Sequence, residues 1–119
     1  MQEEVDYIKR VYPTLKYLIT VCTGSALVAR SGVLDGRKAT SNKRSWEFAI
    51  SQRPNVDWVH KARWVKDGNI YTSSGVSAGI DAFFQLIEDV CGSQMADEVA
   101  GIQEYRREKD SLNDPFANV

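Results

Sequence analysis

The chain has 119 residues, of which 15 are basic and 16 are acidic, giving a formal net charge of −1. This length suits one domain with its own core, and the near-zero charge excludes electrostatic attraction to nucleic acid or an anionic membrane. The apolar runs are too short to span a membrane, and the acidic start, Met1 to Glu4, is unlike a signal peptide. With two cysteines and no metal-ligand spacing, we expect reduced thiols, a cytoplasmic location, no metal and no cofactor.

Helical and strand patterns alternate along the chain. The spacing of apolar residues predicts helices over residues 3–12, 25–29, 45–51, 80–90 and 93–107. Strands are predicted at 15–21, 39–40 and 56–59, and at 64–65 and 70–73, which an Asp-Gly turn joins as a hairpin. This alternation predicts an α/β fold with a largely parallel sheet. We assign residues 1–107 to a single domain and expect residues 108–119, which are polar, to form a loosely ordered tail.

Two short loops follow predicted strands. Cys22-Thr23-Gly24 comes directly after the strand at 15–21 and opens a helix, while Ser74-Gly75 comes after the strand at 70–73. Because ligands of parallel α/β sheets bind at the carboxyl ends of the strands, both loops are expected at the same edge. The sequence therefore predicts one site between them.

Cys22 is the strongest candidate for a reactive side chain. A thiol attacks as its thiolate, and a helix N-terminus favours that form while its N–H groups can hold an oxyanion. The small residues 24–26 would let the backbone approach a substrate closely. The competing interpretation is a buried structural thiol, which is the common role of free cysteines.

The other chemically capable side chains have weaker cases. Cys91 lies at the end of a predicted helix, where the dipole disfavours a thiolate, so we expect a structural role. His60 is the only histidine, and its position on a strand-like segment favours a structural or surface role. We expect Lys61, Arg63 and Lys66 to form a solvated strand edge.

Three motifs, in this order, resemble the DJ-1/PfpI superfamily, which shares the class I glutamine amidotransferase-like fold. They are LITVCTGSAL (18–27), SGVLDGRKAT (31–40) and YTSSGVSAGID (71–81). The sequence is similar in style to fungal members of the isocyanide hydratase-like branch. This resemblance implies a flavodoxin-like three-layer α/β sandwich with a nucleophile elbow. It also implies that the first strands of the usual fold are missing, because the sequence starts at the helix before the nucleophile strand.

The same resemblance implies a cysteine-dependent hydratase, a lyase in which the cysteine attacks the isocyanide carbon and water completes conversion to a formamide. Cys22 would be the nucleophile and Thr23 its hydrogen-bonding neighbour. Substrate would be bound by Gly24, Asn42, Ser74, Gly75 and Val76. Many relatives carry histidine where Asn42 stands, and an amide is no general base. That difference argues against a glyoxalase-like or protease-like mechanism.

Family members also pair the cysteine with an acid from an N-terminal half that this sequence lacks. The resemblance therefore implies that the acid comes from another chain or from the missing half. Half a parallel sheet leaves an unpaired edge and an uncovered apolar face, so we expect a homo-oligomer or a partner chain that completes the sheet. Two alternatives are a non-catalytic DJ-1/PfpI-like subunit and a redox or electrophile sensor acting through Cys22.

Overall fold

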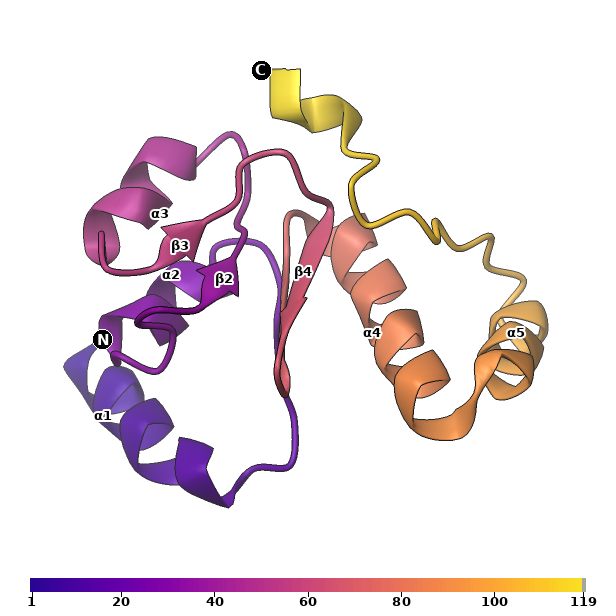
Figure 1. Cartoon of the computed structure of the whole chain (residues 1–119), viewed down its shortest axis with the longest axis horizontal. Coiled ribbons are helices and arrows are strands. Elements are labelled where there is room, and N and C mark those ends of the chain that lie inside the picture. The colour runs from indigo at the N-terminus through magenta and orange to yellow at the C-terminus, as the bar shows by residue number, and fades with distance from the viewer. Residues whose placement is uncertain (119) are drawn as a thin grey trace.

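The computed structural model describes residues 1–118 and confirms the alternation of helices and strands (Figure 1). Seven helical and five strand segments follow one another in this part of the chain. In order they are α1 (Gln2–Val11), η1 (Tyr12–Thr14), β1 (Leu18–Thr20), α2 (Gly24–Arg30), β2 (Lys38–Ala39), α3 (Trp46–Gln52), β3 (Asp57–Trp58), β4 (Trp64–Asp67), β5 (Ile70–Ser73), α4 (Val76–Cys91), α5 (Ser93–Ile102) and η2 (Pro115–Asn118).

The strands form two small sheets that are largely parallel. In the first sheet, with order β1-β5-β4, β1 pairs with β5 in parallel and β4 pairs with β5 in the predicted antiparallel hairpin. In the second sheet, β2 pairs in parallel with β3. Thr20 faces Thr72 in the register of β1 and β5, so the loops after these two strands leave the sheet at the same edge, as expected.

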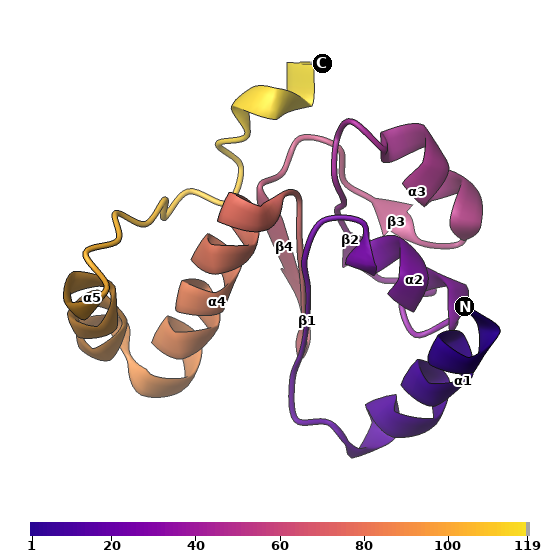
Figure 2. The same cartoon turned by 180° about the vertical axis from the view of Figure 1, so that it is seen from behind.

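Helices cover the strands from two sides, which gives the α/β class that the sequence predicts. Figures 1 and 2 show α1, α2 and α3 on one side of β4 and β1, with α4 and α5 on the other. A buried cluster fills the first side, formed by Val28, Ala29, Leu34, Ala39, Val56 and Ile70. On the second side, α4 buries Ala78, Ala82 and Phe84. Within residues 1–118, no helix is both long and apolar enough to cross a membrane.

Two elements are shorter than the sequence pattern predicts. The strand expected at 15–21 is regular only over Leu18–Thr20, because the four-residue strand β5 is its pairing partner. The helix expected to reach residue 107 ends at Ile102. Two residues later Glu104 has a φ of 52°, and the Tyr105 N–H donates to the Ala100 carbonyl at 2.9 Å. A left-handed residue with such a bond ends a helix.

Gly79 permits α4 to pack closely against the end of β1. A Cβ atom added at Gly79 would lie 2.8 Å from both methyl groups of Val21 and 3.3 Å from the Ser73 hydroxyl. We therefore expect Gly79→Ala to lower the free energy of unfolding by about 1–3 kcal/mol, as overpacked core substitutions do. Urea denaturation followed by circular dichroism measures this change.

The matched control is Gly101→Ala in α5, where no atom lies within 4 Å of the added Cβ. Because alanine favours a helix over glycine, this variant is expected to gain up to about 1 kcal/mol. Equal stabilities for the two variants would contradict the close packing of α4 on β1.

Candidate functional site

Cys22 lies at the turn between β1 and α2, as the sequence predicts. Its φ angle is 59°, in the left-handed region that side-chain-bearing residues seldom adopt. The Cys22 N–H donates to the Ser73 carbonyl at 3.1 Å, and the Gly24 N–H donates to the Val21 carbonyl at 3.0 Å. The first bond joins the ends of β1 and β5, the second closes the turn, and together they hold the strained residue in place. Strain of this kind persists only where the surroundings fix it, and it gathers at functional sites.

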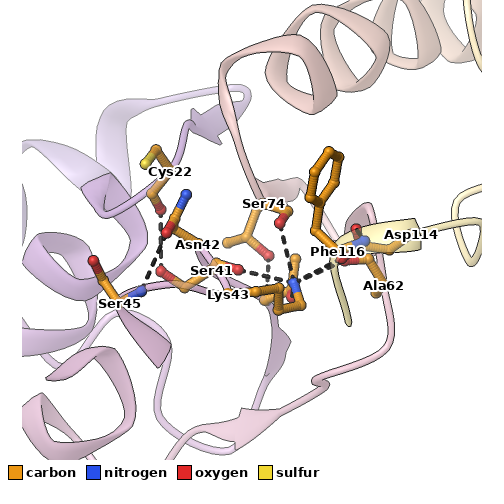
Figure 3. A network of polar contacts seen from close by, with 11 residues as sticks. Cys22, Ser41, Asn42, Lys43, Ser45, Ala62, Ser74, Asp114 and Phe116 are labelled. Atoms are coloured by element: carbon orange, nitrogen blue, oxygen red, sulfur yellow. Dashed lines mark hydrogen bonds and ion pairs between the residues drawn. The ribbon is translucent and has the colours of Figure 1, made fainter. Parts of the chain in front are cut away.

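The Cys22 carbonyl is fixed by two buried hydroxyl groups. The Ser25 hydroxyl donates to it at 3.2 Å and the Ser41 hydroxyl at 3.1 Å. Ser41 belongs to the loop after β2, so a third segment of chain supports the elbow (Figure 3). Cys22 is half-buried and Thr23 is exposed, which leaves the thiol partly accessible from solvent.

A pocket of about 860 Å³ lies beside this elbow, and some of the predicted site residues line it. Its wall includes Asn42, Ser74, Gly75 and Val76. Cys22, Thr23 and Gly24 are on the elbow and not among its lining residues. The Ser41 hydroxyl contacts the elbow, and the next residue, Asn42, lines the pocket and accepts a hydrogen bond from the Ser45 N–H at 3.2 Å. The structure thus brings the two predicted loops together, and the binding role of each residue remains a prediction.

Lys43 is one of the residues that line the pocket, and sequence reasoning missed it. Its side chain is 1% exposed, and its ammonium group lies 3.2 Å from a carboxylate oxygen of Asp114. Four further oxygens, of Thr40, Ser41, Ala62 and Ser74, lie 2.9 to 3.1 Å from the ammonium group and share its three N–H donors. Figure 3 shows this network. Burial lowers the pKa of Lys43, while Asp114 acts in the opposite direction. No local pattern marks this lysine, because lysine is usually a surface residue.

Arg63 was expected on a solvated edge, and for this residue the expectation was wrong. Its guanidinium donates two hydrogen bonds, of 2.9 and 2.7 Å, to one carboxylate oxygen of the fully buried Asp81. The other oxygen accepts hydrogen bonds from the Tyr105 hydroxyl and the Glu108 N–H, both at 3.0 Å. A buried carboxylate needs such partners, which explains why Arg63 turns inward. Burial, followed by the bond to Asp81, raises the pKa of Tyr105.

His60 lies at the pocket, whereas Cys91 lies away from it at the end of a helix. The His60 ring meets the Trp46 ring edge-on, with 4.8 Å between centroids, and both residues line the pocket. Cys91 is exposed at the end of α4. In the described part of the chain, no three His, Cys, Asp or Glu side chains are grouped so that they could hold a metal ion.

Comparison with known proteins identifies relatives of this chain. Residues 2–89 match the DJ-1/PfpI family. The chain is 31% identical over 105 residues to the isonitrile hydratase of Pseudomonas putida, covering 87% of this chain and 44% of that protein. It is 35% identical over 78 residues to the HTH-type transcriptional regulator CdhR of Pseudomonas aeruginosa, covering 66% of this chain and 23% of the regulator.

A solved structure gives a similar result. The crystal structure of a ThiJ/PfpI family protein from Pseudomonas syringae superposes with a TM-score of 0.71 at 26% identity, covering 89% of this chain and 43% of that one. The chain therefore spans less than half the length of each of these three proteins.

Proposed function

Since this chain belongs to the DJ-1/PfpI family, we propose that it is a cysteine-dependent hydratase that adds water to an isocyanide, with Cys22 as its nucleophile. The observation that carries the proposal is the left-handed conformation of Cys22, fixed by hydrogen bonds from three segments of chain. An elbow of this kind presents a nucleophile at the end of a sheet. The similarity to an isonitrile hydratase favours this chemistry.

The proposed reaction consumes one water molecule and needs no redox partner. The Cys22 sulfur attacks the terminal carbon of R–N≡C, and that carbon takes up a proton, which gives a thioimidate, R–N=CH–S–Cys. Water then adds across the carbon–nitrogen double bond, with its proton going to nitrogen, and the carbon–sulfur bond breaks as the new hydroxyl group returns its proton to the donor of the first step. The product is the formamide R–NH–CHO, and the thiolate is regenerated. The Thr23 hydroxyl is proposed to hydrogen bond beside the sulfur, with Asn42, Ser74, Gly75 and Val76 around the substrate.

The proton donor for the first step is proposed to come from a polypeptide segment outside the described residues. Within residues 1–118, every hydrogen bond of Cys22 runs through its backbone, and none joins its sulfur to a carboxylate. A donated acid would complete the site. Free thiols at Cys22 and Cys91 suit a reducing compartment, so we propose a cytoplasmic location.

The test is conversion of benzyl isocyanide to N-benzylformamide, followed by NMR, together with intact-mass detection of a thioimidate on the protein. The proposal expects formamide, or, if the acid is absent, one slowly formed thioimidate per chain at Cys22, with water as the proton donor. The absence of both the formamide and the adduct would refute the proposal. Peroxide that converts Cys22 selectively to a stable sulfinic acid in a protein without hydratase activity would favour the sensor alternative.

We also propose that the chain associates through the free edge of β1 and the neighbouring face of α4. Among residues 1–118, β1 pairs only with β5, and the buried hydroxyl of Thr20 has no hydrogen-bond partner. Beside it lies an apolar groove of about 380 Å³, where Val21, Val76, Ile80 and Phe83 are exposed. An unpaired edge next to such a face favours association with a second copy or with a separate chain that completes the sheet.

Native mass spectrometry and analytical ultracentrifugation test this association. The unmodified protein is expected to form an oligomer, and Phe83→Glu is expected to shift it to monomer, because a carboxylate would be buried in the contact. Ile102→Glu is the matched control, since Ile102 is exposed but lies outside the groove. A wild-type chain that is monomeric both alone and in pull-downs from its native cells would contradict the proposal.

A further inference from the structure

The last residues of the described chain are tied to the pocket by buried groups. We call residues 108–118 the strap. The Glu108 N–H donates to buried Asp81, and the Arg63 N–H donates to the Ser111 carbonyl at 2.6 Å. Asp114, with a side chain only 2% exposed, forms the ion pair with Lys43. These contacts fix the strap at three points against the edge of the sheet where the pocket opens.

The strap places one aromatic side chain in the pocket wall. One carboxylate oxygen of Asp114 accepts the Phe116 N–H at 3.0 Å, while the other faces Lys43. Asp114 therefore anchors the turn η2 and orients Phe116 in the same contact. Phe116, which lies beside Asp114 in Figure 3, lines the pocket and is 63% exposed. Val76, the first residue of α4, also lines the pocket and is 71% exposed. Two exposed apolar side chains at one pocket gain hydrophobic stabilisation if a ligand covers them.

The charged side chains that line the pocket are largely neutralised by ion pairs with other residues of the chain. Lys43 is paired with Asp114, and Arg63 is paired with Asp81. The remaining charged residues that line it, Arg44 and Glu47, are exposed and of opposite sign. The described walls thus offer no net charge to bind an ionic ligand, while Trp46, Phe116 and Val76 offer apolar surface. This combination favours a neutral ligand with an apolar substituent.

We propose that the strap completes the substrate pocket and that Phe116 is a specificity-determining residue, which selects neutral substrates carrying an apolar, ring-sized substituent. This inference rests on the proposed hydratase function for the identity of the reacting group. We place the reacting carbon at the Asn42 end, because the preceding residue, Ser41, donates to the backbone carbonyl of Cys22 and so brings this end of the pocket next to the elbow. The substituent extends from Asn42 across the pocket to Phe116, and both of these residues line the pocket.

The test measures binding separately from turnover. N-benzylformamide, a neutral product analogue, is titrated into Cys22→Ser protein, and the Kd is followed by tryptophan fluorescence and ligand-observed NMR. Phe116→Ala in this background is expected to weaken binding about tenfold, which is the loss of one aromatic contact. Leu112→Ala is the matched control, because Leu112 is also exposed on the strap but does not line this pocket. Its Kd is expected to be unchanged.

In the active protein, Phe116→Ala is expected to lower kcat/KM for benzyl isocyanide relative to methyl isocyanide. Unchanged affinity for N-benzylformamide in Phe116→Ala, or no binding to the parent protein, would overturn the inference. If the formamide binds and Phe116→Ala weakens this binding, while isocyanides give neither formamide nor an adduct on Cys22, the hydratase proposal fails and the pocket assignment stands. Asp114→Asn is expected to weaken binding like Phe116→Ala, since it releases the turn that orients the ring.

Discussion

Replacing Cys22 with serine is expected to lower the rate of formamide production by at least about 1000-fold, as loss of a covalent nucleophile does in other enzymes. Serine keeps the size and the Cβ atom of cysteine, so the left-handed backbone at this position can be retained. Its hydroxyl is a far weaker nucleophile than a thiolate, because it is almost fully protonated near neutral pH. The variant therefore separates chemistry from folding. Product NMR and intact-mass detection of the thioimidate measure the loss.

Cys91→Ser is the matched control, since it makes the same chemical change at an exposed site on the end of α4. Its rate is expected to stay within about twofold of the unmodified protein, as for a residue that touches no substrate. Circular dichroism should show the same fold for all three proteins. A Cys22→Ser protein that still hydrates isocyanides at the original rate would exclude Cys22 as the nucleophile.

Replacing Asp81 with asparagine is expected to lower the free energy of unfolding by about 3–5 kcal/mol, the usual effect of removing one partner from a buried ion pair. Asp81 is fully buried and accepts two hydrogen bonds from Arg63, one from Tyr105 and one from the Glu108 backbone. Asparagine removes the negative charge and leaves the partly buried guanidinium uncompensated. Urea denaturation at neutral pH measures the change.

The chain offers a control in a second arginine–aspartate pair, joined by two hydrogen bonds of the same lengths at the surface. Arg53 donates hydrogen bonds of 2.9 and 2.7 Å to Asp35, and both side chains are more than a third exposed. Solvent screens such a pair, so Asp35→Asn is expected to lower the free energy of unfolding by only a small fraction of the amount expected for Asp81→Asn. The double replacement Arg63→Met with Asp81→Leu should recover part of the lost stability, because it leaves no charge unpaired. Equal losses of unfolding free energy for Asp81→Asn and Asp35→Asn would contradict the conclusion that burial makes the Asp81 ion pair important for stability.

The features that the sequence predicts correctly are those encoded by neighbouring residues. The elbow at Cys22 follows from a strand pattern, three small residues and a helix pattern in succession, and the hairpin follows from its Asp-Gly turn. The common edge of the two loops follows from the parallel pairing of β1 with β5. The loop after the strand at 70–73 identified Ser74 as a candidate and the family resemblance identified Asn42, and both lie in the pocket wall.

The features that the sequence does not predict depend on pairs of residues far apart in the chain. Lys43, Arg63 and Asp81 resemble ordinary surface charges, because their types are common on exposed helices and strand edges. Their burial depends on partners in other elements, such as Asp114 on the strap for Lys43. Residues 108–119 were expected to form a loosely ordered tail from their polar composition, and their order in solution remains a prediction. The contacts of Asp114 could not be inferred from composition.

The left-handed conformation of Cys22 has a consequence for how this protein could evolve or be engineered. Glycine adopts positive φ angles readily, whereas a residue with a Cβ atom is strained there. At this position the residue that best suits the backbone is therefore different from the residue that the proposed reaction requires. A selection for thermal stability alone would favour variants that have lost the thiol. Under the proposed function, cysteine is retained at the elbow for its chemistry, at the expense of a more stable fold.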